Sequence, residues 1–158
     1  MHMKNRKTVR KDGFTLPELL ITTVILAIVL VGMLTLFLNA SVLGNYSTNK
    51  TLVMIEVQNK LEEIRSHSFT AISADYASGG APGDTFDLTL LPGKGKIYID
   101  STKPDLLEIE VVVSYQNQNG RVIGEDADLD GVLDAGEDTD SNGKLSSEAT
   151  LVTMVAHR

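Results

Sequence analysis

The sequence predicts an α+β fold in which a long N-terminal helix packs against a small antiparallel β-sheet. Three observations support this prediction. A charge-free apolar run lies near the N-terminus, apolar residues continue after it at helical spacing, and the C-terminal half contains β-like segments separated by turn residues. The 158 residues suffice for one compact domain with a core, but not for two once a membrane segment is subtracted.

The net charge of −7 is unevenly distributed along the chain. Residues 1–13 form a basic leader with a charge of +4, which leaves −11 on the remainder. Its charged residues are Lys4, Arg6, Lys7, Arg10, Lys11 and Asp12. An acidic body argues against nucleic acid as a partner, because phosphate binding requires clustered Lys and Arg. The chain has no cysteine, so neither a disulfide nor a thiolate metal site is available.

The apolar run from Leu19 to Leu38 contains twenty residues without a charge. A helix of this length crosses a hydrocarbon core of about 30 Å. The basic flank then stays in the cytoplasm by the positive-inside rule. A cleaved secretory signal is the weaker interpretation, because its apolar region usually has about 7–15 residues and residues 38–40 make a poor cleavage site. The sequence therefore predicts a retained membrane-spanning helix.

Apolar residues continue at helical spacing beyond the membrane run, and Glu56 and Lys60 form an i,i+4 pair. These apolar residues are Leu43, Tyr46, Val53, Val57, Leu61 and Ile64. We therefore expect one helix from Phe14 to about Arg65, near 75 Å long at 1.5 Å per residue. Residues 14–40 would be embedded in lipid or partners, and residues 41–65 would be the amphipathic helix of an extracytoplasmic head formed by residues 41–158.

The remainder of the head is predicted to be a connecting loop and a sheet. Residues 66–84 are rich in Ser, Ala and Gly and lack periodicity, which is typical of a loop. Within residues 85–158, strands are expected where β-forming residues lie between turn signals. The expected strands are residues 85–91, 96–100, 106–116, 121–124 and 149–156, with a Pro-Gly-Lys-Gly turn at residues 92–95 between the first two. The amphipathic part of the helix should cover one face of this sheet.

The residues KDGFTLPELL, which begin at Lys11, resemble the type IV prepilin cleavage and N-methylation signature. The resemblance joins a basic leader, Gly13, Phe14, Glu18 and an apolar helix in one order. It implies the type IV pilin fold, and it implies that an inner-membrane prepilin peptidase cuts between Gly13 and Phe14 and methylates the new amino group. The catalytic residues of that reaction belong to the processing enzyme.

Physical chemistry agrees with this interpretation of the N-terminal residues. The ring of Pro17 clashes with a helical carbonyl four residues earlier, so the uncut peptide at Gly13 is expected to stay extended. After cleavage, Pro17 falls among the first four helical positions, whose N–H groups need no helical partner. Glu18 is a carboxylate at membrane depth and needs a cation. The new ammonium of Phe14, from the same or a neighbouring subunit, is the nearest candidate. Such a pair fits a packed bundle of helices, whereas a position of Glu18 at the water interface fits one isolated helix.

Two further stretches, VQNKLEEIRSHSF and TLVTMVAHR, make the chain more similar to PilV-type minor pilins and minor pseudopilins than to a major pilin. The resemblance thus implies a structural subunit, polymerised through its N-terminal helix with other pilin or pseudopilin subunits. Its precursor would be a single-pass inner-membrane protein with a cytoplasmic N-terminus. His2, His67 and His157 lack catalytic neighbours in the sequence, and nothing indicates an enzyme.

An acidic segment, residues 125–148, contains nine acidic residues and one lysine. Its residues 126–137, DADLDGVLDAGE, match the calcium loop pattern D-x-[DN]-x-[DN]-G-x₅-E at every specified position. Ca²⁺ takes six to eight oxygen ligands, and Gly131 would supply the sharp turn. The candidate ligands are Asp126, Asp128, Asp130, the carbonyl of Val132, Asp134 and Glu137.

A second copy of the pattern follows at once, with candidate ligands Asp138, Asp140, Asn142 and Lys144. Its twelfth place is Ala149, and Glu148 stands one residue early. The competing interpretation is a solvated acidic loop whose like charges repel. Because strands are predicted on both sides, bound calcium would act as a structural clip between strands and not as a helix-opening sensor.

Three functions remain open from the sequence. The first is a minor pilin or pseudopilin with a calcium clip. The second is a membrane-anchored calcium-binding module that does not polymerise, for which Gly13, Phe14 and Glu18 would be superfluous. The third, compatible with the first, is an adhesin at the tip of the same filament. The sequence does not choose between a pilus, a secretion pseudopilus and a DNA-uptake system.

Overall fold

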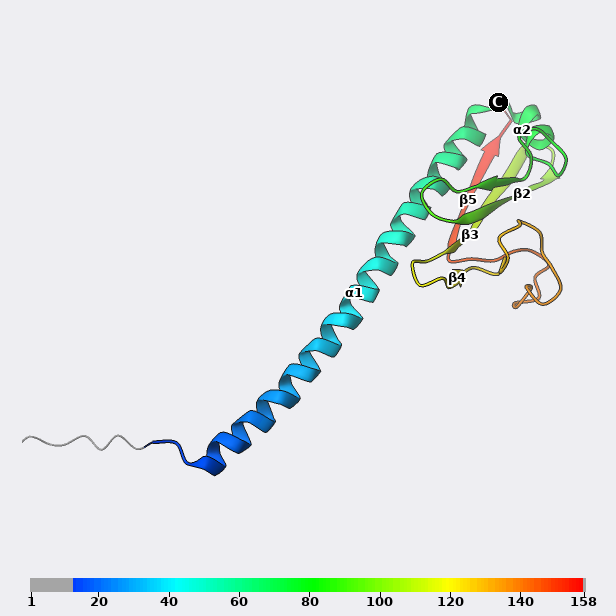
Figure 1. Ribbon diagram of the computed structural model, residues 1–158. Coiled ribbons are helices and arrows are strands. Elements are labelled where there is room, and N and C mark those ends of the chain that lie inside the picture. Colours follow the sequence, from blue (N-terminus) through cyan, green and yellow to red (C-terminus); the bar gives the residue numbers. More distant parts are fainter. Residues whose placement is uncertain (1–12, 158) are drawn as a thin grey trace, which may run out of the picture. The chain divides into compact units, whose positions relative to one another are not determined.

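A computed structural model describes residues 13–157, so all of the predicted leader except Gly13 lies outside the described residues. The chain folds as a long helix and a five-stranded antiparallel sheet (Figure 1), which confirms the predicted α+β class and is consistent with the type IV pilin fold. The helices and strands are α1 (Leu16–Ser66), α2 (Phe69–Asp75), β1 (Thr85–Asp87), β2 (Gly93–Lys103), β3 (Leu106–Gln116), β4 (Val122–Ile123) and β5 (Ala149–Ala156).

The chain divides into two compact units, Met1–Val42 and Leu43–Arg158, and α1 contributes to both. In the first unit, α1 begins where the Thr15 carbonyl accepts hydrogen bonds from the amides of Glu18 (3.1 Å) and Leu19 (3.2 Å). Pro17 therefore lies in the first turn, where its missing N–H costs nothing. Gly13 is not helical, as the proline argument predicts, but Phe14 and Thr15 are not helical either, so the helix begins two residues later than the predicted Phe14.

Every residue from 13 to 42 is exposed, and α1 is long and apolar enough to cross a membrane. The threonine hydroxyls within residues 19–38 are satisfied by the helix itself. Thr22 donates to the Glu18 carbonyl at 2.9 Å, and Thr35 donates to the Val31 carbonyl at 3.0 Å. Such internal bonding is what a helix in hydrocarbon requires, because lipid offers no hydrogen-bond partners.

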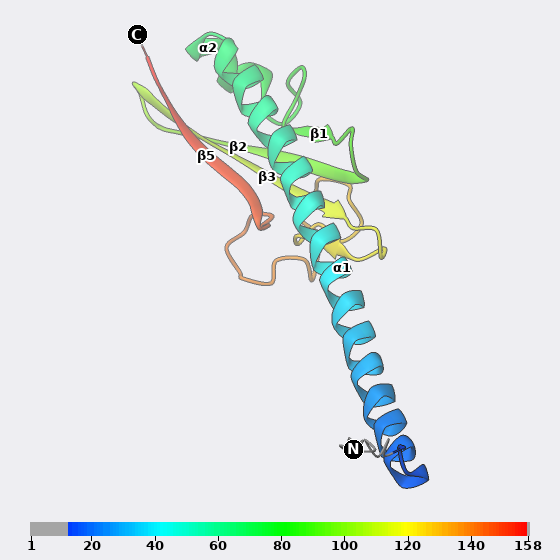
Figure 2. The ribbon, with the colours of Figure 1, turned by 90° about the vertical axis from the view of Figure 1, so that its left-hand side faces the viewer.

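In the second unit, the C-terminal part of α1 covers one face of the sheet, as predicted (Figure 2). Val53, Val57, Leu61 and Ile64 repeat at three- and four-residue intervals, so they share one side of the helix and are buried. They form the core with alternate residues of β3, which are Leu107, Ile109, Val111, Val113 and Tyr115. At about 2 kcal/mol for each fully buried aliphatic side chain, this layer is the main attachment of helix to sheet.

The sheet has the order β1-β2-β3-β4, and β5 also pairs with β3. Strand β3 is thus central, with β2 along one side and β5 along most of the other, and all pairs are antiparallel. Its even-numbered residues point away from α1, yet Val112 and Ser114 are 2% exposed. The acidic segment covers them. The Asp126 amide donates to the Ser114 hydroxyl at 3.4 Å, and the Leu145 amide donates to the Tyr98 hydroxyl at 2.8 Å.

Three predicted assignments between residues 66 and 103 need correction. Residues 66–84 are not entirely a loop, because α2 forms within them and its Ser68 cap accepts a hydrogen bond from the Ala71 amide at 3.4 Å. Seven residues are too few to show a helical period in the sequence. The first predicted strand also ends at Asp87, and β2 already begins at Gly93. A β-carbon at Gly95 would lie 2.2 Å from the Phe86 ring, so this glycine permits close strand packing instead of forming a turn.

Candidate functional site

The predicted processing and assembly residues lie together at the start of the described chain. Gly13 and Phe14 are exposed and precede the helix, and the Phe14 side chain is 75% exposed. Glu18 lies in the first turn of α1 and is also exposed. Glu18 therefore lies between the exposed, non-helical residues 13–15 and the apolar part of α1. This is the N-terminal end of the helix, where the helix dipole favours negative charge.

The first acidic loop gathers three of its predicted ligands. Oxygens of Asp126, Asp128 and Asp130 lie within 4.8 Å of one another. Asp126 is 1% exposed, and its carboxylate accepts the amides of Asp130 at 3.1 Å and Gly131 at 2.9 Å. Burial raises the pKa of Asp126, although these two N–H groups oppose the shift. Because each carboxylate oxygen has a second lone pair, the cluster can still bind a cation that prefers oxygen.

The second loop repeats the conformation of the first at an offset of twelve residues. The Asp138 carboxylate, at position 1 of the second loop, accepts hydrogen bonds from the amides of positions 5 and 6, which are Asn142 at 2.9 Å and Gly143 at 3.0 Å. Asp126 accepts the amides of positions 5 and 6 of the first loop in the same way. The fourth residues, Leu129 and Ser141, have φ values of 61° and 59°. Positive φ is uncommon outside glycine, so its recurrence at the same place shows that both loops make the same turn. Sequence spacing predicted this repeat.

The other predicted ligands are not gathered in the same way. Asp134 and Glu137 lie outside the group formed by the first three aspartates. Both Glu137 oxygens already accept loop amides, from Ala127 at 2.7 Å and Asp134 at 3.0 Å. The hydrogen bonds from Asp134 and Ala127 lower the pKa of Glu137. Val132 exposes 52% of its surface, and the Lys144 ammonium pairs with Glu110 at 3.1 Å.

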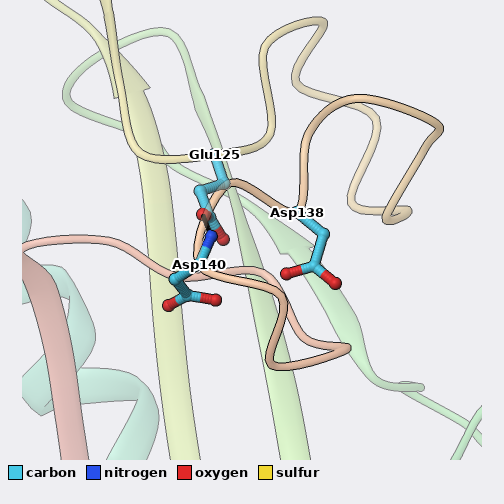
Figure 3. A group of neighbouring side chains, drawn as sticks. All are labelled: Glu125, Asp138 and Asp140. Atoms are coloured by element: carbon cyan, nitrogen blue, oxygen red, sulfur yellow. Dashed lines mark hydrogen bonds between the residues drawn. The ribbon is translucent and has the colours of Figure 1, made fainter.

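Sequence reasoning missed Glu125 as a member of the second cluster. Oxygens of Glu125, Asp138 and Asp140 lie within 4.8 Å of one another, although Glu125 precedes the first loop (Figure 3). Its carboxylate accepts the amides of Thr139 at 2.9 Å and Ser146 at 2.9 Å. The Thr139 hydroxyl, and then these amides, lower the pKa of Glu125. Glu125 lies outside the twelve-residue pattern, so no spacing rule could have found it.

His67 was also misjudged as isolated. Its Nδ1 lies 2.9 Å from a carboxylate oxygen of Asp75, and its Nε2 lies 3.3 Å from the Tyr76 hydroxyl. The Tyr76 hydroxyl donates to Glu63 at 3.1 Å. Burial, and then the bond to Glu63, raises the pKa of Tyr76 to about 12, so the phenol stays protonated at neutral pH and is a poor nucleophile. This cluster joins α1 to α2 and needs no catalytic explanation.

Residues 9–34 match the family model described as the prokaryotic N-terminal methylation motif. This match supports a type IV pilin-like protein. A search of curated proteins and a search of solved structures each found no match. The motif covers Gly13, Phe14, Glu18 and the first part of α1, and it implies processing by a prepilin peptidase and assembly with other pilin subunits. It points to a structural subunit with a membrane-anchored precursor that is later assembled into pili.

In this pilin-like chain, Glu148, which stands one residue before the twelfth place of the second acidic loop, is not part of either carboxylate cluster. Its carboxylate instead accepts hydrogen bonds from the hydroxyls of Tyr115, at 3.1 Å, and Tyr46, and pairs with the Lys50 ammonium at 3.5 Å. Burial alone would raise the pKa of Glu148, but the bonds from the two tyrosines and Lys50 lower it. Glu148 thus fastens the start of β5 to α1.

We expect Glu148→Gln to destabilise the head at neutral pH by about 2 kcal/mol, because hydrogen bonds to a charged group are worth roughly 1.5–3 kcal/mol. The folded-state pKa of Glu148 lies below the usual 4.5, so its contribution is present above that value and is lost as pH falls through the folded pKa. Urea unfolding at several pH values measures this difference. The difference in unfolding free energy between the wild type and Glu148→Gln should vanish in acid. As a control, Glu62→Gln, at a side chain that is 74% exposed, should change the unfolding free energy little at any pH. A difference that persists in acid would contradict the assignment.

Proposed function

We propose that the chain is a minor pilin or minor pseudopilin, inserted in the inner membrane with its N-terminus in the cytoplasm, cut between Gly13 and Phe14, and polymerised through the first part of α1. The observation that carries the proposal is the coincidence of the methylation motif at residues 9–34 with the apolar first part of α1, whose residues 16–42 are all exposed. A helix that buries nothing of itself needs lipid or other helices around it. A simple anchor would need no methylation motif.

Glu18 has a specific role in this proposal. A carboxylate at membrane depth costs a few kcal/mol unless it is neutralised or paired. Cleavage creates an ammonium at Phe14, only four residues away, which can pair with Glu18 of the same or a neighbouring subunit. A pair between neighbours would set the axial register of adjacent helices in a filament. Processing is therefore a precondition for assembly and not only the removal of a leader.

The processing prediction is tested on protein extracted from membranes of cells that contain a prepilin peptidase. Mass spectrometry is expected to find a chain that begins at Phe14 and carries one methyl group on its amino terminus. Gly13→Leu should leave the chain uncut, because the resemblance to prepilins implies a small glycine directly before the scissile bond. An intact leader in the wild-type protein, or a start in the region of Ser41, would refute the pilin function.

The head, in our proposal, holds calcium as a structural clip. Two oxygen clusters support this, one from Asp126, Asp128 and Asp130, and one from Glu125, Asp138 and Asp140. Both consist of carboxylates, which suit a hard divalent cation. The acidic segment carries a net charge of −8, and unless cations bind, these charges repel one another within a short stretch of chain. Bound calcium would therefore hold the segment against the sheet and fix the start of β5.

A further inference from the structure

The β5 edge of the sheet lies unprotected within the described part of the chain. β5 pairs with β3 on one side only, and no strand pairs with its other side among residues 13–157 (Figure 2). Its eight residues, ATLVTMVA, include no charge and no proline. Natural edge strands are usually short, charged or interrupted, because a regular edge accepts further strands. On the opposite side, β1 has only three residues, and the part of β2 beyond its pairing with β1 carries the charged residues Asp100 and Lys103.

Side chains beside this edge combine apolar and acidic character. On the sheet face opposite α1, Met154 lies across from Glu108, and Val152 lies across from Glu110. Met154 is 59% exposed and Val152 is 52% exposed. Both are large apolar residues at the sheet margin, next to carboxylates on the adjoining strand. A partner that covers Met154 and Val152 therefore also lies close to the carboxylates of Glu108 and Glu110.

Two carboxylates on this face, Asp100 and Glu108, form no ion pair within the described chain. Asp100 lies directly across from Glu108 in the β2–β3 register, and like charges at such positions are destabilising. Glu110 pairs with Lys144 at 3.1 Å, whereas Asp100 and Glu108 take part in none of the ion pairs among the described residues. The Thr102 amide donates to Asp100 at 2.8 Å, and this bond, with Lys144 and Lys103 nearby, lowers the pKa of Asp100. Glu108 is therefore the carboxylate on this face that a cationic partner would neutralise.

We propose that β5 accepts an extended basic segment of a partner protein as an additional strand. Main-chain hydrogen bonds to the free edge supply the attachment. An added strand lies about 10 Å from β3, two strand spacings away. A Lys or Arg at alternate positions can lay its aliphatic stem over Met154 or Val152 and extend its charge toward Glu108 or Glu110.

Charge complementarity favours this occupant over a second copy of the same chain. Pairing of two β5 strands would bring two acidic faces together, and β5 itself contributes no cation to neutralise them. A basic segment satisfies both the free backbone edge and the unpaired carboxylates. The proposal does not depend on the pilin function, because a subunit or any other partner with this chemistry could supply the strand.

The test uses the full-length chain in an uncharged detergent and a capped eight-residue peptide in which Lys alternates with Val and Thr. Calorimetry should detect binding. The same peptide with N-methyl groups on alternate amides, which blocks strand pairing but keeps the charge, should bind at least tenfold more weakly. A peptide with Glu in place of Lys should not bind. Equal binding of the N-methylated peptide would show charge attraction alone and overturn the proposal.

Variants of the chain locate the binding surface. Met154→Lys should weaken peptide binding at least tenfold, because it puts a like charge where the peptide stem must lie. Leu90→Lys is the matched control, since Leu90 is a similarly exposed apolar residue, at 53%, in the loop between β1 and β2. It should bind like the wild type. Equal weakening by both variants, or a chain that forms dimers through β5 in place of peptide binding, would refute the proposal.

Discussion

Removal of calcium from the full-length protein is expected to lower the melting temperature of the head by about 10 °C. A ligand at one hundred times its dissociation constant stabilises the folded state by about 2.7 kcal/mol, and a domain of this size loses a few degrees per kcal/mol. The physical cause is the repulsion within the acidic segment, which bound calcium cancels. Because the unfolded segment has no preformed site, binding energy becomes folding energy. Circular dichroism with calcium and then with excess chelator measures the shift.

Variants separate calcium binding from general loss of charge. Asp128→Asn and Asp140→Asn each remove one carboxylate from one cluster, and we expect the double variant to melt at the same temperature with calcium and with chelator. Asp105→Asn removes an exposed carboxylate outside the acidic segment and should keep the full shift. If the wild-type protein melts identically under both conditions, the clip does not exist and the segment is only a solvated loop.

Glu18→Ala is expected to leave membrane insertion intact and to reduce incorporation into filaments at least tenfold. Insertion cannot suffer, because the change makes the helix more apolar. In an assembled bundle, however, removal of one partner leaves the other charge buried without compensation, at a cost of about 3–5 kcal/mol. The ratio of the protein in sheared filaments to that in membranes measures the effect in cells that make the other subunits.

The control for this experiment is Glu62→Ala, which removes an exposed carboxylate from the head portion of the same helix and should assemble normally. Normal assembly of the Glu18 variant would exclude the proposed pairing. Failure of the wild-type chain to enter filaments at all would favour a membrane-anchored module that does not polymerise. The two results are therefore distinguishable.

Several elements could be predicted from the sequence because their signals are local. The strands Leu106–Gln116 and Ala149–Ala156 have the predicted boundaries, since alternating apolar residues and flanking turns mark both ends. The helix ends one residue beyond the predicted Arg65. The repeat of the acidic loops follows from a spacing of twelve residues. In each case, the residues that specify the element belong to it or are its immediate neighbours in the sequence.

The failures concern contacts between residues far apart in the chain. Gly95 looks like a turn residue in the sequence, and only the packing of Phe86 against it explains why a glycine is needed. No sequence signal assigned a role to Glu148, because Tyr46 and Lys50, which hold it against α1, lie about a hundred residues earlier. Spacing rules carry no information on such pairs.

The sequence by itself determined the features of the N-terminal region. The methylation motif, the charge-free helix and the first-turn position of Pro17 and Glu18 all follow from consecutive residues. Tertiary structure alone decided which carboxylates meet. Folding of the acidic segment over the sheet brings Glu125 to Asp138 and Asp140, while Asp134 and Glu137 stay outside the first cluster. The physical reason is that a helix or a spanning segment is specified by local periodicity, whereas a cluster of side chains depends on the path of the backbone between them.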